Sequence, residues 1–462
     1  MPPLYPLRTR PKVHDVTAAP RAAELMRASA PRSPSAHLVA AGGAGHLLVP
    51  NGSQVYALDA TMYALLEDAL ASGDEAAVEA RLQALGVTHP PLVDDRPLAS
   101  PPLHALSLAI AQKCNLGCTY CYAEQGEFGG DAKNMPLEAA CAAVDLLLSG
   151  VPAGGRVNLA FLGGEPLINR AALRATTEYA VRRGAEQRIG VTFSITTNGT
   201  LITPDDGVFF ERHGFAVTVS IDGSRDAHDA LRPFKGGRGS YDRVIGNVAP
   251  LLALQHRMQV SARVTVTPRN LALRETLDEL VGLGFHSVGF SPMLASPHGH
   301  GEMTAPELAA MLEQMVACGD ELERSVRAGR RYPFANLVNA LREIHRGTHR
   351  PYPCGAGAGY LGVSADGDLA ACHRFVGDPD RAFGTTAAID RDKQDAWLSE
   401  RHIHRQEPCR SCWARYLCGG GCHHEVIHRG RPACDYVRGW LHYAIGVYGR
   451  LIEARPDWFG EP

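Results

Sequence analysis

The feature that most constrains the fold is a regular alternation of strand-like and helix-like segments between residues 104 and 325. The strand-like segments alternate apolar and polar residues and lie near 103–111, 156–163, 190–197, 215–222, 259–267 and 286–292. Amphipathic helical segments follow most of them, at 136–149, 170–183, 203–213, 241–255 and 273–284. Six β-α repeats predict an α/β fold with a parallel sheet, which is either doubly wound or curled into a partial barrel.

Regions with other patterns flank this repeat. Residues 37–95 carry short strand-like runs and then two helical stretches, and a proline-rich segment at 90–102 closes this small α/β module. Residues 1–35 have no steady period and are expected to form a loose arm. From about residue 350 Cys, Gly and His are frequent, which predicts a small domain held together by metal. The predicted domains are residues 1–100, 101–330 and 331–462.

The composition excludes several classes of function. Lysine and arginine number 46 against 49 aspartates and glutamates, whereas nucleic-acid-binding proteins carry a basic excess. No stretch reaches 18 consecutive apolar residues, and the first 15 residues lack the apolar segment of a secretory signal. We therefore expect a cytoplasmic protein with no nucleic-acid or membrane partner, in which the 12 cysteines bind metal rather than form disulfides. Cys141 and Cys318 stand apart in helical runs and are predicted to be buried, inert thiols.

The first cysteine group is Cys114, Cys118 and Cys121, with the spacing C-x3-C-x2-C directly after the first strand of the repeat. A cubane iron–sulfur cluster has four irons, so three thiolates on one loop leave one iron open to a substrate. The alternative is a structural zinc site, but zinc requires four closed ligands and no fourth Cys or His lies near this loop. The spacing therefore favours an iron–sulfur cluster with an open iron.

A second group lies near the C-terminus and has the spacing C-x2-C-x5-C-x3-C, in Cys409, Cys412, Cys418 and Cys422. Upstream, Cys354 and Cys372 bracket two alternating runs joined by Asp366-Gly367, which is a strong hairpin signal. A hairpin brings residues 354 and 372 toward each other, as two ligands of one metal centre require. Cys434 follows at a distance.

Two further motifs carry less weight. Residues 424–428 match the zinc-protease pattern H-E-x-x-H, but they adjoin Cys422 in a cysteine framework that already accounts for the segment. Gly357, Gly359 and Gly362 match G-x-G-x-x-G, but no β-α-β unit surrounds them and a hairpin follows. We expect neither a protease nor a dinucleotide site.

The first cysteine group resembles the signature of the radical SAM enzymes, C-x3-C-x-aromatic-C, with Tyr120 as the aromatic residue. The resemblance extends to GGEP at 163–166, TTNG at 196–199, SIDG at 220–223 and the arginine of DALRP. It implies that S-adenosylmethionine (SAM) binds the open iron of a [4Fe–4S] cluster and, on reduction, releases a 5′-deoxyadenosyl radical. By this resemblance Glu165 holds the SAM amino group and Arg232 its carboxylate. The full set of implied cofactor contacts is Tyr120, Gly163, Gly164, Glu165, Asn198, Ser220 and Arg232.

The later cysteines resemble the SPASM extension of peptide-modifying radical SAM enzymes, which holds two auxiliary [4Fe–4S] clusters. The resemblance assigns one cluster to Cys409, Cys412, Cys418 and Cys434, and the other to Cys354, Cys372 and Cys422. Sulfatase maturases have a further cysteine where this chain has Thr348, so the second cluster is expected to keep an open iron unless His345 or His349 closes it. The resemblance implies three clusters, a partial (β/α)6 TIM-like barrel and a C-terminal Cys-rich SPASM domain.

Among SPASM proteins the chain is most similar to the thioether-forming peptide maturases, over residues 114–130, 220–242 and 353–378. The likeness implies a peptide or small-protein substrate with Cys and acidic residues, and a reducing donor such as flavodoxin or ferredoxin. Residues 37–95 resemble a winged-helix-like peptide-recognition element, with a generic N-terminal cap as the alternative. The catalytic residues are unknown, although His373 is a candidate for moving a proton. Other functions left open are another ribosomal-peptide maturase, oxidation of Cys or Ser to formylglycine in a sulfatase, and a non-catalytic zinc module.

Overall fold

The computed structural model describes residues 22–41, 44–297 and 299–460. The chain divides into two compact units, each discontinuous in sequence. The first unit contains the described residues of 1–96 together with 304–354 and 400–462. The second contains 97–303 and 355–399.

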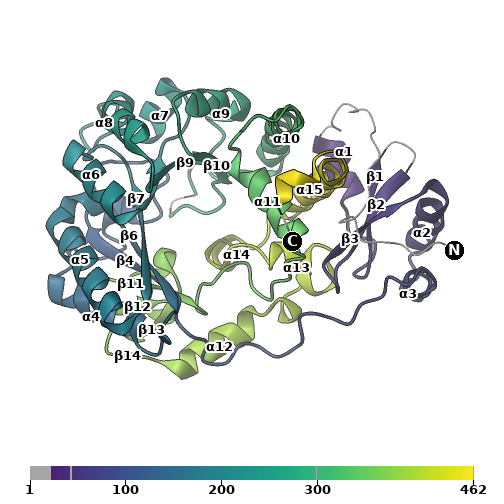
Figure 1. Cartoon of the computed structure of the whole chain (residues 1–462), viewed down its shortest axis with the longest axis horizontal. Helices are drawn as coiled ribbons and strands as arrows, with labels where there is room; N and C mark the ends of the chain where they lie inside the picture. Colours follow the sequence, from purple (N-terminus) through teal and green to yellow (C-terminus); the bar gives the residue numbers. More distant parts are fainter. Residues whose placement is uncertain (1–21, 42–43, 298, 461–462) are drawn as a thin grey trace. The chain divides into compact units, whose positions relative to one another are not determined.

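Parallel strands form the framework of the second unit, and their bounds follow the predicted segments closely (Figure 1). The strands are β4 (Ala105–Gln112), β6 (Arg156–Gly163), β7 (Gly190–Thr197), β8 (Ala216–Ser220), β9 (Gln259–Val266) and β10 (Ser287–Pro292). Each pairs in parallel with the next along the chain. The parallel sheet is confirmed. The choice between a doubly wound sheet and a partial barrel stays a prediction.

The cysteine-flanked hairpin extends the same sheet on the other side of β4. β11 (Tyr360–Val363) pairs in parallel with β4 and antiparallel with β12 (Asp368–Ala370), and Gly367 in the turn has a φ of 91°. β13 (Ala382–Thr385) and β14 (Ala388–Ile389) continue outward, and β5 (Lys133–Asn134) pairs with the end of β4. The hairpin is confirmed, but its union with the parallel sheet was not predicted.

Helices cover the apolar face of the parallel strands (Figure 1). On β8, Val217 and Val219 are at most 1 % exposed, whereas Thr218 and Ser220 remain partly exposed. Alternate strand residues therefore supply the core that the helices bury. The helices of this region are α4 (Leu137–Leu148), α5 (Arg170–Gln187), α6 (Pro204–His213), α7 (Arg225–Leu231), α8 (Tyr241–Leu254), α9 (Leu273–Gly282) and α12 (Arg391–Arg401).

From β6 to β10 the opposite side of the strands is mainly hydrophilic and at least partly exposed, whereas β4 is buried along almost its whole length. Parallel strands that are covered on both faces are usually continuous apolar runs, and the strands from β6 to β10 are not. Hydrogen bonds join neighbouring side chains across this surface, from Ser194 to Asn158 at 3.2 Å and between Ser261 and Ser287 at 2.8 Å. We call the surface the polar face, and its members are Asn158, Ser194, Thr196, Thr218, Ser220, Ser261, Arg263, Thr265, Ser287 and Ser291.

The N-terminal module of the first unit has the predicted α/β composition. β1 (His37–Ala41), β2 (Ala44–Val49) and β3 (Gln54–Leu58) pair antiparallel, and α2 (Ala60–Ser72) and α3 (Glu75–Ala84) follow them. The loose-arm prediction is wrong for part of its length, because Ala22–Ala28 form helix α1 with Leu25 only 2 % exposed. The remainder of the predicted arm, residues 1–21, lies outside the described residues.

Helix α15 (Cys434–Ala454) is central to the first unit and packs against α1, α10 (Ala305–Arg327) and α11 (Ala335–His345). The buried Glu323 of α10 pairs with Arg450 of α15 at 2.8 Å. His37 of β1 stacks on Trp413, with ring centroids 3.6 Å apart, and shares a 2.9 Å hydrogen bond with His442. The N-terminal module and the cysteine-rich region therefore share one core. The short helices α13 (Arg415–Cys418) and α14 (His423–Arg429) complete this region.

No helix within the described ranges is both long enough and apolar enough to cross a membrane.

Candidate functional site

The first cysteine loop starts where β4 ends and packs closely on the segment that follows β6. The Glu165 N–H donates to the Lys113 carbonyl at 2.7 Å, and the Gly164 N–H to the Ala111 carbonyl at 2.9 Å. A Cβ on Gly164 would overlap the carbonyl oxygen of Lys113, and one on Gly126 would lie 2.8 Å from Gly164 Cα. The glycines of GGEP are therefore needed for the loop to approach, while the SAM contacts predicted for Gly163 and Gly164 stay predictions.

Cys114, Cys118 and Cys121 lie close enough for their charges to act on one another. The pKa of Cys118 is raised to about 12, mainly by burial. Arg232 acts in the lowering direction, and the other two thiols contribute to the rise. The Leu116 N–H donates to Cys114 Sγ at 3.4 Å, and Asn198 Nδ2 donates to it at 3.7 Å. Three soft thiols with hydrogen-bond donors and a nearby guanidinium form a donor set suited to an iron–sulfur cluster.

A cluster and a single metal ion require different spacings of their thiolate ligands. Within residues 22–41, 44–297 and 299–460, no three His, Cys, Asp or Glu side chains are placed to hold one metal ion. Sulfurs around one zinc lie about 4 Å apart, because each Zn–S bond is about 2.3 Å long. A cubane binds each thiolate at a different iron, so its ligands lie further apart.

Tyr120 and Arg232 meet at a buried carboxylate, Asp222. The Tyr120 hydroxyl donates to Asp222 Oδ2, and Arg232 Nη1 donates to the Tyr120 oxygen at 2.6 Å. Burial raises the pKa of Asp222, while Arg232 and the Tyr120 hydrogen bond lower it. The Arg232 Nε is buried and has no hydrogen-bond partner in the described part of the chain. A buried guanidinium N–H without an acceptor fits a ligand carboxylate, the group predicted for Arg232.

Glu165 and Asn198 meet at the ends of β6 and β7. The Glu165 carboxylate is fully buried and accepts hydrogen bonds from the Asn198 N–H at 2.7 Å, Thr197 Oγ1 at 2.8 Å and the Leu167 N–H at 3.1 Å. Burial raises the pKa of Glu165, and these three donors lower it. Asn198 also donates to Asn115 of the cysteine loop at 2.9 Å. Here Glu165 joins two strand ends, and its contact with the SAM amino group stays a prediction.

A chain of hydrogen bonds behind Arg232 involves residues that sequence analysis missed. The Asp222 N–H donates to His228 Nδ1 at 3.2 Å, His228 Nε2–H donates to Ser240 Oγ at 2.9 Å, and Ser240 Oγ donates to the Arg232 carbonyl at 2.6 Å. Burial, and then Arg232, lowers the pKa of His228 to about 3, so the imidazole is neutral near pH 7. Asp222 and His228 act as positioning residues for Arg232. The available signal was their location within and just after SIDG, where a strand ends.

The hairpin brings Cys372 and His373 into the same unit as the first cysteine loop. Burial raises the pKa of Tyr122, Arg374 lowers it, and Cys121 and Cys372 both raise it further. One aromatic ring therefore lies near a predicted ligand of the SAM cluster and near a predicted ligand of the hairpin cluster. Ser220, a predicted SAM contact, is the last residue of β8 and lies on the polar face.

His373 is packed between aromatic side chains. Its ring centroid is 5.9 Å from that of Tyr122, and its Nδ1 shares a 2.7 Å hydrogen bond with the Tyr360 hydroxyl. Burial, then Arg374 and Arg263, lowers the pKa of His373 to about 4. The ring is therefore neutral near pH 7, and its role in moving a proton stays a prediction.

The first unit brings together Cys409, Cys412, Cys418 and Cys434. The pKa of Cys409 is raised to about 11, mainly by burial. Arg431 acts in the lowering direction, and the other three thiols contribute to the rise. Burial raises the pKa of Cys418, and hydrogen bonds from the Gly420 and Gly421 N–H groups lower it. Mutual proximity and N–H donors to sulfur fit the cluster that the resemblance assigns to these four residues.

Cys354 and Cys422 belong to the first unit and Cys372 to the second, so this ligand set stays a prediction. The segment before Cys354 packs on the turn after Cys418, because a Cβ on Gly419 would lie 2.5 Å from Pro353 Cα. His345, considered as a further ligand, stacks on Phe459 with ring centroids 4.9 Å apart. His349 Nδ1 lies 3.1 Å from the Gly347 carbonyl oxygen.

The lone cysteines, the H-E-x-x-H motif and the glycine motif show no binding site in the described part of the chain. Cys318 is fully buried in α10 as predicted, but Cys141 is partly exposed in α4, so its predicted burial is wrong. His424 and His428 face each other on α14 with ring centroids 4.5 Å apart, and no third ligand joins them among the residues described. Gly362 packs on Cys372 inside the hairpin, and no helix begins there to bind a dinucleotide.

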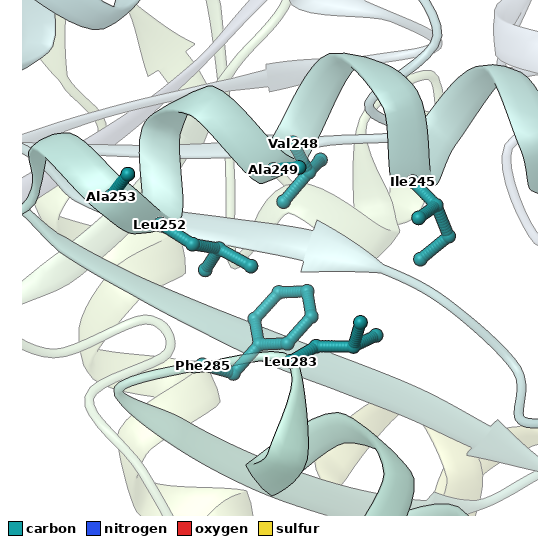
Figure 2. Close-up of a pocket in the computed structure, with 7 residues that line it drawn as sticks. All are labelled: Ile245, Val248, Ala249, Leu252, Ala253, Leu283 and Phe285. Carbon is teal, nitrogen blue, oxygen red and sulfur yellow. The ribbon is translucent and has the colours of Figure 1, made fainter.

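A pocket on the helix-covered side of the second unit is lined only by apolar side chains. Figure 2 shows apolar side chains of α8 facing two residues that follow α9. None of the predicted site residues lines the pocket. Its lining is Ile245, Val248, Ala249, Leu252, Ala253, Leu283 and Phe285.

Comparisons with known proteins agree with this geometry. Residues 108–280 match the radical SAM superfamily. The chain is 26% identical over 354 residues to the serine-type anaerobic sulfatase-maturating enzyme of Klebsiella aerogenes, covering 74% of this chain and 85% of that protein. Its fold is similar to anSMEcpe with bound AdoMet, with a TM-score of 0.64, 19% identity and coverage of 77% of this chain and 100% of that one. It is also similar to Streptococcus suis SuiB bound to its precursor peptide SuiA, with a TM-score of 0.51, 16% identity and coverage of 87% and 97%.

Proposed function

We propose that this chain, whose residues 108–280 match the radical SAM superfamily, is a peptide maturase that joins a Cys sulfur to a carbon of Asp or Glu in a thioether crosslink. The observation that carries the proposal is the position of Tyr122, whose ring lies near Cys121 and Cys372. A substrate residue beside this ring lies near ligands of two predicted clusters. Position 348 carries threonine rather than cysteine, so the hairpin cluster has one ligand position left for a substrate thiol.

The proposed substrate is the small γ subunit of quinohemoprotein amine dehydrogenase, in which Cys sulfurs join the β- or γ-carbons of Asp or Glu. The support is the likeness of residues 114–130, 220–242 and 353–378 to the maturation protein of that enzyme. Another ribosomally made peptide with the same residue types would be handled by the same chemistry. The N-terminal module, in which β1 and β3 are the edge strands of a three-stranded sheet, is the part proposed to bind the peptide.

The proposed cofactors are SAM and three [4Fe–4S] clusters, reduced by a flavodoxin- or ferredoxin-type donor. When bound, they supply the radical that removes a carbon-bound hydrogen atom and take up the electron released as the thiol loses its proton and the carbon–sulfur bond forms. This chain's residues position the reactants. Arg232, fixed by Tyr120 and Asp222, orients SAM, and the polar face holds the peptide.

Mass spectrometry tests the proposal on a γ-subunit-like peptide that contains Cys and acidic residues. After anaerobic incubation with SAM and reduced enzyme, we expect the loss of two hydrogens per Cys and thiols that no longer react with alkylating reagents. An unchanged peptide with deoxyadenosine still produced would leave the radical chemistry in place and remove this substrate.

Replacing a predicted hairpin ligand separates the two halves of the reaction. We expect Cys354→Ala to abolish crosslinking and to spare uncoupled SAM cleavage, because the SAM loop does not include this residue. Deoxyadenosine and crosslinked peptide are measured in the same samples. Cys141→Ala is the matched control, since Cys141 belongs to no predicted ligand set and should retain both activities. Full crosslinking by Cys354→Ala would contradict thiol binding at this cluster.

Formylglycine formation in a sulfatase is the second candidate, supported by the similarity to the Klebsiella aerogenes enzyme. The threonine at position 348 and the N-terminal module weigh against it. Incubation of the enzyme with a sulfatase peptide distinguishes the two functions. Formylglycine is an aldehyde and reacts with hydrazine reagents, whereas a thioether does not react with them.

A further inference from the structure

We propose that Arg431 and Arg438 are positioning residues that raise the reduction potential of one proposed cluster, the one assigned to the four-cysteine group. We call these two residues the flanking arginines. The inference deepens the proposed function and rests on it, because it names the side chains that adjust one of the three proposed clusters. The members of the four-cysteine group are Cys409, Cys412, Cys418 and Cys434.

Arg431 joins two segments that carry cysteines of this group. Its Nη2 donates to Gln406 Oε1 at 2.6 Å, and its Nη1 donates to the Gly420 carbonyl. Gln406 lies three residues before Cys409, and Gly420 lies two residues after Cys418. The two segments also touch directly, because a Cβ on Gly420 would lie 3.2 Å from Gln406 Nε2. The guanidinium is therefore fixed at the place where the two segments meet.

The positive charge of Arg431 acts on a sulfur of this group. Both of its hydrogen-bond partners are neutral oxygens, so these contacts leave the charge in place. Burial raises the pKa of Cys409, and Arg431 is the main group that lowers it. A positive charge that stabilises a thiolate also stabilises the additional electron of a reduced cluster bound to that thiolate.

Arg438 reaches the same group from helix α15. It follows Cys434 by four residues, so the two side chains lie on one face of the helix. Burial raises the pKa of Cys412, while the Ala414 N–H and then the charge and a side-chain hydrogen bond of Arg438 lower it. Arg438 also pairs with Asp435, whose side chain is 72 % exposed, so water screens that negative charge.

One N–H of Arg438 is left for a further acceptor. Its Nε is buried and has no hydrogen-bond partner in the part of the chain that the structure describes. A buried donor of this kind normally has a partner, and the sulfurs of a cluster accept hydrogen bonds. The orphaned Nε therefore fits a cluster bound beside Cys412.

Both flanking arginines act in the same direction. Reduction adds one negative charge to a cluster, and nearby positive charge and hydrogen bonds to sulfur favour the reduced state. The Gly420 and Gly421 N–H groups add two such hydrogen bonds at Cys418. A raised potential suits a cluster that takes up the one electron released when the proposed carbon–sulfur bond forms.

A redox titration of the holoenzyme, followed by electron paramagnetic resonance, tests the inference. The signal of the four-cysteine group is identified as the one that Cys412→Ala lacks. We expect Arg431→Gln and Arg438→Gln each to lower the ratio of reduced to oxidised cluster about tenfold at a fixed potential, which is about 59 mV for a one-electron couple. Arg431→Lys keeps the charge and should retain most of the wild-type potential.

Iron content is measured on every variant, and Arg81→Gln is the matched control, since Arg81 is an exposed residue of α3. A lower potential with unchanged iron supports the proposal. A wild-type potential in both glutamine variants would overturn it, and so would an equal fall in Arg431→Lys and Arg431→Gln, because lost contacts rather than lost charge would then explain the change. If Arg431→Gln loses iron, Arg438→Gln decides by the same measurement.

The titration contains no peptide substrate. An enzyme that forms no thioether can therefore still show the expected fall in potential, and a crosslinking enzyme can still fail to show it. Failure of the proposed function and failure of this inference are separate results.

Discussion

At the scale of single residues, the position of Arg232 depends on neighbours from three segments. Tyr120 of the cysteine loop accepts from its side chain, Asp222 at the end of β8 supplies the negative charge, and Ser240 donates to its carbonyl. A guanidinium fixed from several sides loses little freedom when an anion binds, so more of the interaction appears as affinity. The Arg232 Nε, which has no acceptor among the described residues, is the donor that we expect such an anion to satisfy.

Replacing Arg232 should therefore weaken SAM binding strongly. We expect Arg232→Gln to lower SAM affinity about ten- to hundredfold, because a charged hydrogen bond contributes about 1.5–3 kcal/mol. Equilibrium dialysis with SAM checks this, with iron content confirming that the cluster remains. The exposed Arg269→Gln serves as the control. SAM affinity equal to that of wild type in Arg232→Gln would remove this residue from the cofactor site.

His228 predicts a dependence of stability on pH. Its pKa is lowered to about 3 in the folded chain, against about 6.5 when unfolded, so between these values the unfolded state binds the additional proton. The free energy of unfolding should therefore fall as pH drops from about 6.5 toward 3, by up to about 1.4 kcal/mol per pH unit from this residue. Denaturant titrations of His228→Gln at several pH values should show a smaller slope than wild type. The exposed His256→Gln is the matched control variant.

At the scale of elements, the cysteine loop and the GGEP segment are held together by backbone contacts. Lys113 and Glu165 are joined by a hydrogen bond, and the glycines permit an approach that a side chain would block. The loop therefore takes its conformation from the end of β6 as well as from its own residues.

A methyl group at this contact should disrupt the loop. We expect Gly164→Ala to lose the iron of one cluster and SAM binding with it, because the added Cβ meets the Lys113 carbonyl. Iron analysis and SAM dialysis measure the two effects. Gly236→Ala is the matched control, since a Cβ there meets nothing within 4 Å. Retention of all iron in Gly164→Ala would show that the loop can shift without cost.

The elements that were predicted are those with a visible period. β6, β7 and β9 alternate residue by residue between a helix-covered face and the polar face, so the sequence carries their pattern directly. Helix α15 was missed because residues 439–449 are buried on every side, and a helix apolar all round shows no 3.6-residue period. The pairing of β11 with β4 joins segments about 250 residues apart, which no local pattern reveals.

The site follows the same rule. The cysteines and the motif residues were identified by type and spacing. Asp222 and His228 were missed, because their importance lies in partners that only the fold brings near.

At the scale of the whole molecule, the predicted cluster ligands are distributed over both units. The SAM loop and Cys372 belong to the second unit, and the four-cysteine group with Cys354 and Cys422 belongs to the first. Three cubanes would contain about twelve irons and give a brown protein, whereas a zinc module would be colourless. Metal analysis of protein purified without oxygen should therefore find iron and no stoichiometric zinc. Zinc with little iron would restore the zinc-module interpretation.

The alternation along the parallel strands also divides their positions into those whose mutation destabilises the fold and those that can mutate freely. Residues such as Val217 and Val219 bind the sheet to its helices, and changing them costs stability. Thr218, Ser220 and Arg263 contribute nothing to that core and can vary at little cost to the fold. In the proposed peptide maturase, specificity can therefore change through mutations on this one face. A library confined to that face would be the economical place to look for altered crosslinking, since most of its members should still fold.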